Sequence, residues 1–206
     1  MPDYWERRQR MLAGAIARPV LSEEQAETLQ LASIVEESVV DGPGLRFVVF
    51  TQGCPHRCPG CHNPDTHLKA GGTAYSIDRV LALYDQNPLR RGITLSGGDP
   101  FEQAGAAADL ARAIHQRGGD VITYTGYRLE QLQRKETSDT QALLNETDLL
   151  IDGPFVEARR CSEVPFVGSL NQRLIALSLR GNRLLTSIPA TLNGADVERI
   201  GYAEDH

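Results

Sequence analysis

Strand-like and helix-like segments alternate through most of this 206-residue chain, beginning near Leu29. Strands separated by helices are typical of β-α-β units, whose strands form a parallel sheet. We therefore expect an α/β fold with a parallel sheet. The expected strands are 29–36, 45–51, 93–96, 120–125, 148–151 and 173–179, with 181–185 a candidate for one more, and the expected helices are 76–86, 101–117, 129–135 and 141–145.

The first 28 residues have a different pattern, which predicts a helical N-terminal extension. Residues 5–17 can form a helix, and Ser22-Glu23-Glu24-Gln25 fits a capping box that opens a second short helix. No residue in this stretch indicates chemistry. We expect two parts, the extension at 1–28 and the main domain at 29–206.

Each polar or glycine-rich motif of the main domain directly follows an expected strand. In parallel sheets the functional loops lie at the carboxyl ends of the strands. We therefore expect these motifs to meet at one edge of the sheet and to form a site there. They are the cysteine loop after residue 51, Ser96-Gly97-Gly98-Asp99, Tyr124-Thr125-Gly126-Tyr127 and Asp152-Gly153-Pro154.

Three of the four cysteines, Cys54, Cys58 and Cys61, lie in one loop with the spacing Cys-x3-Cys-x2-Cys. An iron–sulfur cluster usually has four cysteine ligands, so three would leave one iron open for another group. Two alternatives remain. A zinc ion would need a histidine as its fourth ligand, and an electron-carrying cluster would need Cys161.

Composition excludes several classes of function. The net charge of −6 and a pI near 5.4 do not indicate a positively charged surface of the kind that binds nucleic acid. No run of about 20 apolar residues is present to cross a membrane, and the first residues lack the apolar core of a signal peptide. We expect a cytoplasmic protein, in whose reducing environment clustered cysteines bind metal or act in catalysis.

The turn Gly97-Gly98-Asp99 has two interpretations. Glycines lack side chains and let a ligand approach the backbone, and the Asp99 carboxylate is able to accept hydrogen bonds from a ligand ammonium group. Alternatively, this is an ordinary β-to-α turn in which Asp99 caps the next helix.

Together these motifs carry a family resemblance that extends from about Leu29 to Leu179. The cysteine motif followed by Gly-Gly-Asp resembles the radical S-adenosylmethionine (radical-SAM) superfamily. The element Asp41-Gly42-Pro43-Gly44-Leu45-Arg46 resembles that of the activating proteins of glycyl radical enzymes. Further segments resemble the branch that activates anaerobic (class III) ribonucleoside-triphosphate reductase, namely 125–127, 150–155 and 168–173. Gly60 and His62 depart from the aromatic residues usual around the third cysteine.

The resemblance implies a partial β/α barrel and a radical mechanism. A [4Fe-4S] cluster on Cys54, Cys58 and Cys61 would bind S-adenosylmethionine at its fourth iron and cleave it to methionine and a 5′-deoxyadenosyl radical. That radical would take a hydrogen from a glycine of the partner enzyme. Because only one cysteine triplet is present, the electron is expected from an outside donor of the flavodoxin or ferredoxin type.

The resemblance also implies roles for individual residues. The cofactor would lie with its adenine side over Gly60, Cys61 and His62, its methionyl amine at Gly97, Gly98 and Asp99, and its ribose or methionyl groups near Asp152. The partner's glycine loop would contact Asp41, Gly42, Pro43 and Gly44. Cys161 would be a bystander.

Three other functions stay open at this point. The first is activation of a different glycyl radical enzyme, and the second is radical chemistry on a small molecule. The third is a role as an electron-transfer or zinc-binding module. The last of these leaves Gly97-Gly98-Asp99 without a role.

Overall fold

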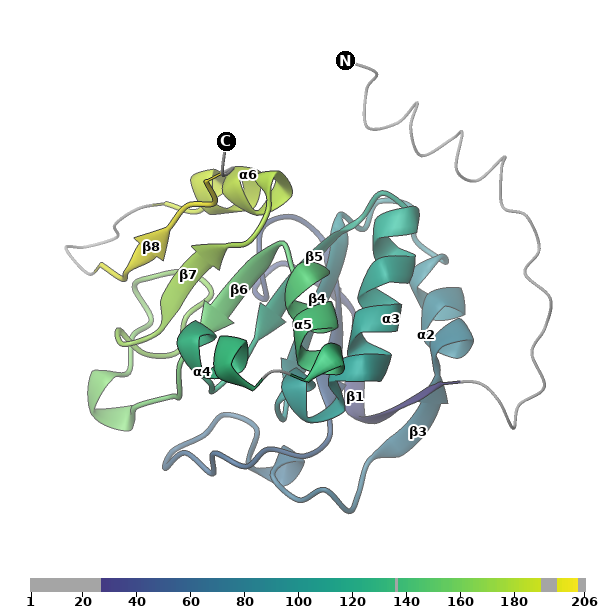
Figure 1. Cartoon of the computed structure of the whole chain (residues 1–206), viewed down its shortest axis with the longest axis horizontal. Helices are drawn as coiled ribbons and strands as arrows, with labels where there is room; N and C mark the ends of the chain where they lie inside the picture. Colours follow the sequence, from purple (N-terminus) through teal and green to yellow (C-terminus); the bar gives the residue numbers. More distant parts are fainter. Residues whose placement is uncertain (1–26, 136, 190–195, 204–206) are drawn as a thin grey trace.

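The computed structural model describes residues 27–135, 137–189 and 196–203, so the expected extension lies almost entirely outside the described residues (Figure 1). One eight-stranded sheet has the order β3-β1-β2-β4-β5-β6-β7-β8. The strands are β1 (Thr28–Ser38), β2 (Arg46–Thr51), β3 (Thr73–Ser76), β4 (Gly92–Gly97), β5 (Asp120–Tyr124), β6 (Leu149–Asp152), β7 (Arg173–Ala176) and β8 (Arg199–Ile200).

Five α-helices and three 3-10 turns connect these strands within the described residues. The helices are α2 (Ile77–Tyr84), α3 (Ala104–Gln116), α4 (Leu129–Arg134), α5 (Ser138–Asn145) and α6 (Leu179–Ser187). The 3-10 turns are η2 (Pro64–Thr66), η3 (Pro100–Gln103) and η4 (Glu157–Arg159). None of the helices in these ranges is long and apolar enough to cross a lipid bilayer.

The sheet is mixed, which corrects the expectation of a parallel sheet in part. Strands β2, β4, β5 and β6 are parallel, as expected from the alternation with helices. By contrast, β1 is antiparallel to β2 and to β3, and β7 is antiparallel to β6. The turn at 39–45 is too short for the helical crossover that a parallel pair needs. The segment 153–172 between β6 and β7 likewise contains no α-helix.

The expected strand at 181–185 is wrong, because these residues belong to α6. Ser178 caps this helix, and its hydroxyl accepts a hydrogen bond from Gly181 N at 3.0 Å. Gly181, Leu184 and Leu185 are buried, and their spacing of three and four residues places them on one helix face. The short strands β3 and β8 were not predicted, because strands of so few residues show no clear alternation of apolar and polar side chains.

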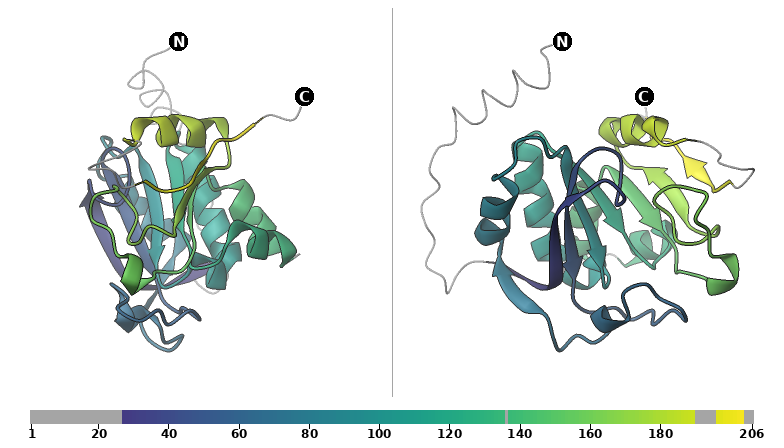
Figure 2. Two further views of the ribbon diagram at one scale, coloured as in Figure 1. Left: turned by 90° about the vertical axis from the view of Figure 1, so that its left-hand side faces the viewer. Right: turned by 180° about the vertical axis from the view of Figure 1, so that it is seen from behind.

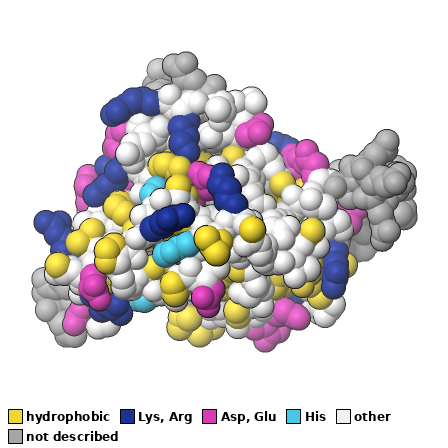
Figure 3. Space-filling view, turned by 90° about the horizontal axis from the view of Figure 1, so that it is seen from below, with side chains coloured by type: hydrophobic (Ala, Val, Ile, Leu, Met, Phe, Trp, Pro, Cys, Tyr) yellow, Lys and Arg dark blue, Asp and Glu magenta, His cyan; other side chains and the backbone are white. Residues whose placement is uncertain are grey.

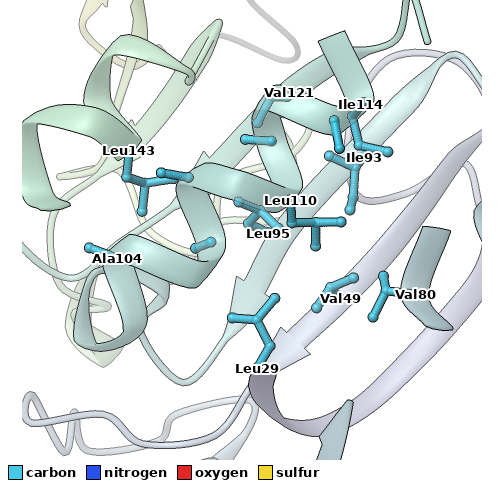
Figure 4. Packing of buried hydrophobic residues seen from close by; sticks show 14 of the residues in the cluster. Leu29, Val49, Val80, Ile93, Leu95, Ala104, Leu110, Ile114, Val121 and Leu143 are labelled. Atoms are coloured by element: carbon cyan, nitrogen blue, oxygen red, sulfur yellow. The ribbon is translucent and has the colours of Figure 1, made fainter. Parts of the chain in front are cut away.

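The main core lies between the sheet and the helices on one of its faces (Figure 1). Val49, Ile93 and Leu95 from β2 and β4 pack in one cluster with Leu110 and Ile114 from α3 (Figure 4). All five are fully buried. On the opposite face, α6 and the segment 153–172 pack against β5, β6 and β7 in a second apolar cluster (Figure 2). On the same face, residues of β2 and β4 line a cavity.

A buried arginine fixes the turn at 41–44 to the centre of the sheet. Arg46 is fully buried, and its guanidinium donates to Asp120 Oδ1 at 2.6 Å and to Thr94 Oγ1 at 2.7 Å. The Thr94 hydroxyl in turn donates to the Asp41 carbonyl at 2.8 Å. The arginine of the Asp-Gly-Pro-Gly-x-Arg element thus ties its own turn to β4 and β5.

Replacing Arg46 with methionine is expected to lower the free energy of unfolding by about 3 kcal/mol, because Asp120 and the Ile93 carbonyl lose a buried partner. Arg91 makes the matched control, since it pairs with the same carboxylate at 2.9 Å but is 36% exposed. Arg91→Met should change the free energy by less than about 1 kcal/mol. Urea denaturation measures both, and equal effects would contradict the assignment.

Candidate functional site

The cysteine loop connects β2 to β3 at the edge where the parallel strands end (Figure 1). Its backbone closes on itself, because Gly53 N donates to Thr66 O at 2.8 Å and Cys54 N donates to His67 O at 3.2 Å. Positive φ angles at Gly53 (97°), Arg57 (46°) and Gly60 (69°) allow the tight course of the chain. Viewed from this edge, histidine and basic side chains lie among hydrophobic ones near the middle of the face (Figure 3).

The three thiols of the loop are free and partly buried. Burial raises the pKa of the Cys54 thiol to about 11, while the peptide N–H groups of His56 and Arg57 oppose that rise. Burial also raises the pKa of Cys58. The Asn63 N–H donates to Cys61 Sγ at 3.4 Å.

These surroundings fit a metal cluster. A bound cation removes the cost of a buried thiolate, and N–H donors to sulfur are typical of iron–sulfur sites. Among the residues that the structure describes, no three His, Cys, Asp or Glu side chains are grouped as ligands of a single metal ion. In a [4Fe-4S] cluster each cysteine binds a different iron, so its sulfurs do not meet at one point.

The Gly97-Gly98 pair packs against the start of the cysteine loop. Gly98 N donates to Thr51 O at 2.7 Å, and Asp99 N donates to Gly53 O at 2.8 Å. A Cβ atom on Gly98 would lie 2.3 Å from the Gly53 carbonyl oxygen. One on Gly97, whose φ is 95°, would lie 2.6 Å from the Phe50 backbone. Contact between two chain segments therefore requires these glycines, which is a different reason from the ligand approach that the sequence suggested.

The Asp99 side chain is fully buried and accepts several hydrogen bonds. It caps η3 by accepting from Phe101 N at 3.0 Å, as one of its two interpretations expected. It also accepts from Thr125 Oγ1 at 2.9 Å and from Gly126 N at 3.0 Å. His56 Nε2 lies 2.9 Å from its Oδ2. In this structure Asp99 joins three segments that are distant in the sequence.

A cavity of about 430 Å³ lies beside the third cysteine and contains several of the predicted site residues. Cys61, His62, Gly97 and Asp41 all line it. The cavity thus brings together the cysteine loop, the glycine turn and the turn at 41–44. Its other lining residues are Val40, Phe50, Asn63, Ser96, Tyr124, Phe155, Phe166, Val167, Gly168 and Gln172.

Other predicted site residues do not line this cavity. Gly98 and Asp99 lie behind Gly97, in contact with the backbone of the cysteine loop. Gly42 and Pro43 are buried within their turn, whereas Gly44 is exposed. Gly60 is exposed on the cysteine loop.

Asp152 is fully buried at the end of β6 and is held by its neighbours. Arg173 Nε donates to it at 2.9 Å and Leu129 N at 2.8 Å. Arg173 also donates a hydrogen bond to Glu130 Oε1 at 2.9 Å. This hydrogen bond lowers the pKa of the Glu130 carboxyl to about 2. Asp152 therefore fixes the start of α4 to β7, and its role toward the cofactor stays a prediction.

Among the aromatic residues of the cavity, the sequence analysis placed Tyr124 in a strand-end motif but did not single out Phe155 or Phe166 as site residues. The Phe155 ring lies 5.1 Å from the His62 ring, and the Arg160 guanidinium lies 5.2 Å from Phe155. Tyr124 Oη donates to Phe166 O at 2.8 Å. Phe155 follows a strand-end Gly-Pro, which is a weak signal for a site residue. Nothing in the sequence marks Phe166.

Cys161 is buried in the second apolar cluster. It packs there with residues such as Ile151 and Leu174. Its Sγ donates to Glu163 Oε2 at 3.2 Å. These contacts account for Cys161 without a role as a ligand.

Comparison with known proteins decides the family. Residues 40–175 match the family described as "4Fe-4S single cluster domain". The anaerobic ribonucleoside-triphosphate reductase-activating protein of Vibrio cholerae is 37% identical over 142 residues, covering 65% of this chain and 89% of that protein. The chain belongs to this family of activating proteins.

Further members give the same result. The proteins of the same name from Salmonella typhi and Escherichia coli are 36% and 32% identical, and each match covers 65% of this chain and 90% of the relative. Among solved structures, QueE from Escherichia coli is similar to this protein over 48% of this chain and 52% of the QueE chain, at 16% identity and a TM-score of 0.41.

Substituting alanine for Gly98 is expected to lower the free energy of unfolding by about 1–3 kcal/mol, because the new methyl group would collide with the Gly53 and Thr51 carbonyls. Gly105→Ala is the control. Its Cβ would meet only the Asp139 side chain, at 3.2 Å, and alanine favours a helix. Urea denaturation should show a loss for Gly98→Ala alone, and a loss of similar size for Gly105→Ala would refute the packing argument.

Serine substitutions separate the two classes of cysteine. Cys54→Ser, Cys58→Ser and Cys61→Ser should each lose most of their bound iron and sulfide after anaerobic reconstitution, because each removes a thiolate ligand. Cys161→Ser should bind iron like the wild type. Iron and sulfide analysis measures this directly, and loss of iron in Cys161→Ser would identify a fourth cysteine ligand.

Proposed function

We propose that this protein is a radical-SAM activating enzyme that generates a glycyl radical on anaerobic ribonucleoside-triphosphate reductase. One observation carries the proposal. The chain covers 89% of a relative that is named as the activating protein of that reductase. The cavity that joins Cys61 to the turn at 41–44 supports it, because a cluster and a partner's glycine would have to meet in such a place.

The three cysteines would hold a [4Fe-4S] cluster with one iron left for S-adenosylmethionine. When bound, the reduced cluster supplies the electron that cleaves this cofactor to methionine and a 5′-deoxyadenosyl radical, which takes a hydrogen from the partner's glycine. The protein's part is to bind, to orient and to exclude water. Val40, Phe50, Phe155, Phe166 and Val167 make part of the cavity lining apolar, and that part suits the exclusion of water from a radical.

We assign the cofactor to the cavity between Cys61 and Gly97. His62 and Gly60 would lie under its adenine side, and the Gly97-Gly98-Asp99 turn would bind the methionyl amine. His62 and Gly97 support this assignment because both line the cavity. Asp99 and Asp152 already accept hydrogen bonds from the protein, so any cofactor group bound there would share their oxygens.

The glycine loop of the reductase would contact the turn Asp41-Gly42-Pro43-Gly44. Asp41 lines the cavity, and its carbonyl is held by Thr94. Because the buried Arg46 network makes this turn rigid, the turn would present a fixed surface to the partner.

Three finer assignments belong to the same proposal. The parallel strands β2, β4, β5 and β6 would form part of a partial β/α barrel, with the cavity in its interior. The electron would come from a flavodoxin or ferredoxin-type donor. The protein would work in the cytoplasm, where its free thiols remain reduced.

The test is anaerobic reconstitution followed by mixing with the reductase, S-adenosylmethionine and a reductant. Electron paramagnetic resonance should detect a glycyl radical on the reductase, together with formation of 5′-deoxyadenosine. Cys58→Ser should yield neither product. If 5′-deoxyadenosine forms without the glycyl radical, the substrate is another protein or a small molecule.

A further inference from the structure

His56 lies between the first two cysteines, and its side chain points into the body of the protein. Its Nε2 lies 2.9 Å from Asp99 Oδ2, and because a carboxylate only accepts, the imidazole donates. Only 17% of the His56 side chain is exposed. Within the described residues, the Asp99 carboxylate receives its other hydrogen bonds from Phe101, Thr125 and Gly126. His56 is thus the link from the cysteine loop to this carboxylate.

The turn Thr125-Gly126-Tyr127 forms the surface on which the His56 ring rests. A Cβ on Gly126 would lie 2.3 Å from His56 Cδ2, so only glycine leaves room for the ring. The Tyr127 ring packs edge-on against His56 with centroids 4.4 Å apart.

That surface is itself held rigidly. Tyr127 Oη donates to Glu102 at 2.8 Å, and the Lys135 ammonium lies 3.6 Å from the centre of the Tyr127 ring. Glu102 belongs to η3, which begins directly after Asp99. The turn that supports the His56 ring is therefore fixed to the segment that contains Asp99, the hydrogen-bond partner of His56.

We propose that His56 is a positioning residue that holds the cysteine loop in register with the Gly97-Gly98-Asp99 turn, and that Thr125-Gly126-Tyr127 is its seat. The inference rests on the proposed function, since it concerns the distance between the cluster and the S-adenosylmethionine site. Side chains that orient ligands from outside the coordination sphere commonly change affinity by about 10- to 100-fold. His56 would act in this way on both the cluster and the cofactor.

The test uses the full-length, anaerobically reconstituted protein and reads the spectrum of the reduced cluster during titration with S-adenosylmethionine. In His56→Ala, the concentration that gives half of the spectral change should rise roughly 10- to 100-fold. His56→Gln should restore most of the response, because the glutamine amide can donate to Asp99. Iron content is measured on each variant, and if His56→Ala loses its iron, the glutamine variant and Gly126→Ala carry the test.

Gly126→Ala supplies an independent route to the same defect. Its methyl group should displace the His56 ring and reproduce the His56→Ala shift. In the double variant the ring is gone and the methyl group has room, so no further shift is expected. Additive shifts, or a His56→Ala protein with wild-type titration and iron content, would overturn the proposal.

His115→Ala is the matched control. His115 is 18% exposed and also lies 2.9 Å from a buried carboxylate, that of Asp148, but it belongs to α3. This variant should keep the wild-type titration even if it unfolds more readily, whereas an equal shift would mean that the effect of His56 is only on general stability. If the wild-type cluster itself does not respond to S-adenosylmethionine, the proposed function fails, which is a separate result.

Discussion

Two backbone hydrogen bonds at the end of the β2–β4 pair determine the geometry of the site. They run from Gly98 N to Thr51 O and from Asp99 N to Gly53 O, and they continue the parallel register that pairs Thr51 with Gly97. Because the cysteine loop begins at Gly53, its starting point is fixed by the turn after β4. The cavity between Cys61 and Gly97 exists only while these two segments stay in contact.

Buried charged residues hold the other parts of the site in place. Arg46 fixes the turn at 41–44, Asp99 joins the cysteine loop to the turn after β5, and Asp152 joins α4 to β7. Each of them has several partners, as a buried charge requires. A loss of activity on replacing one of them therefore does not identify a cofactor ligand by itself, and stability must be measured on the same variant.

Much of the fold was predictable because it depends on local patterns. The β-branched and aromatic run of β2, the short apolar runs of β4 and β6, the Ser76 cap of α2 and the alanine-rich α3 are visible in the sequence, and the structure has elements there. The direction of β7 was less predictable, because its own residues resemble those of the parallel strands. Its antiparallel direction follows from the connection after β6, which contains no α-helix. The segment 181–185 shows why short apolar runs mislead, because Leu184 and Leu185 suit either a strand or a buried helix face.

The sequence by itself determined the chemistry of the cysteine loop, because the spacing of Cys54, Cys58 and Cys61 along one loop limits what they can bind. It also determined that the motifs follow strands and so collect at one edge. Only the tertiary structure decided that Gly97 and Gly98 pack on another backbone, that Asp99 is buried, and that Phe155 and Tyr124 line the cavity. The physical reason is that steric contact and burial depend on which distant segments meet, and no local pattern in the chain records that.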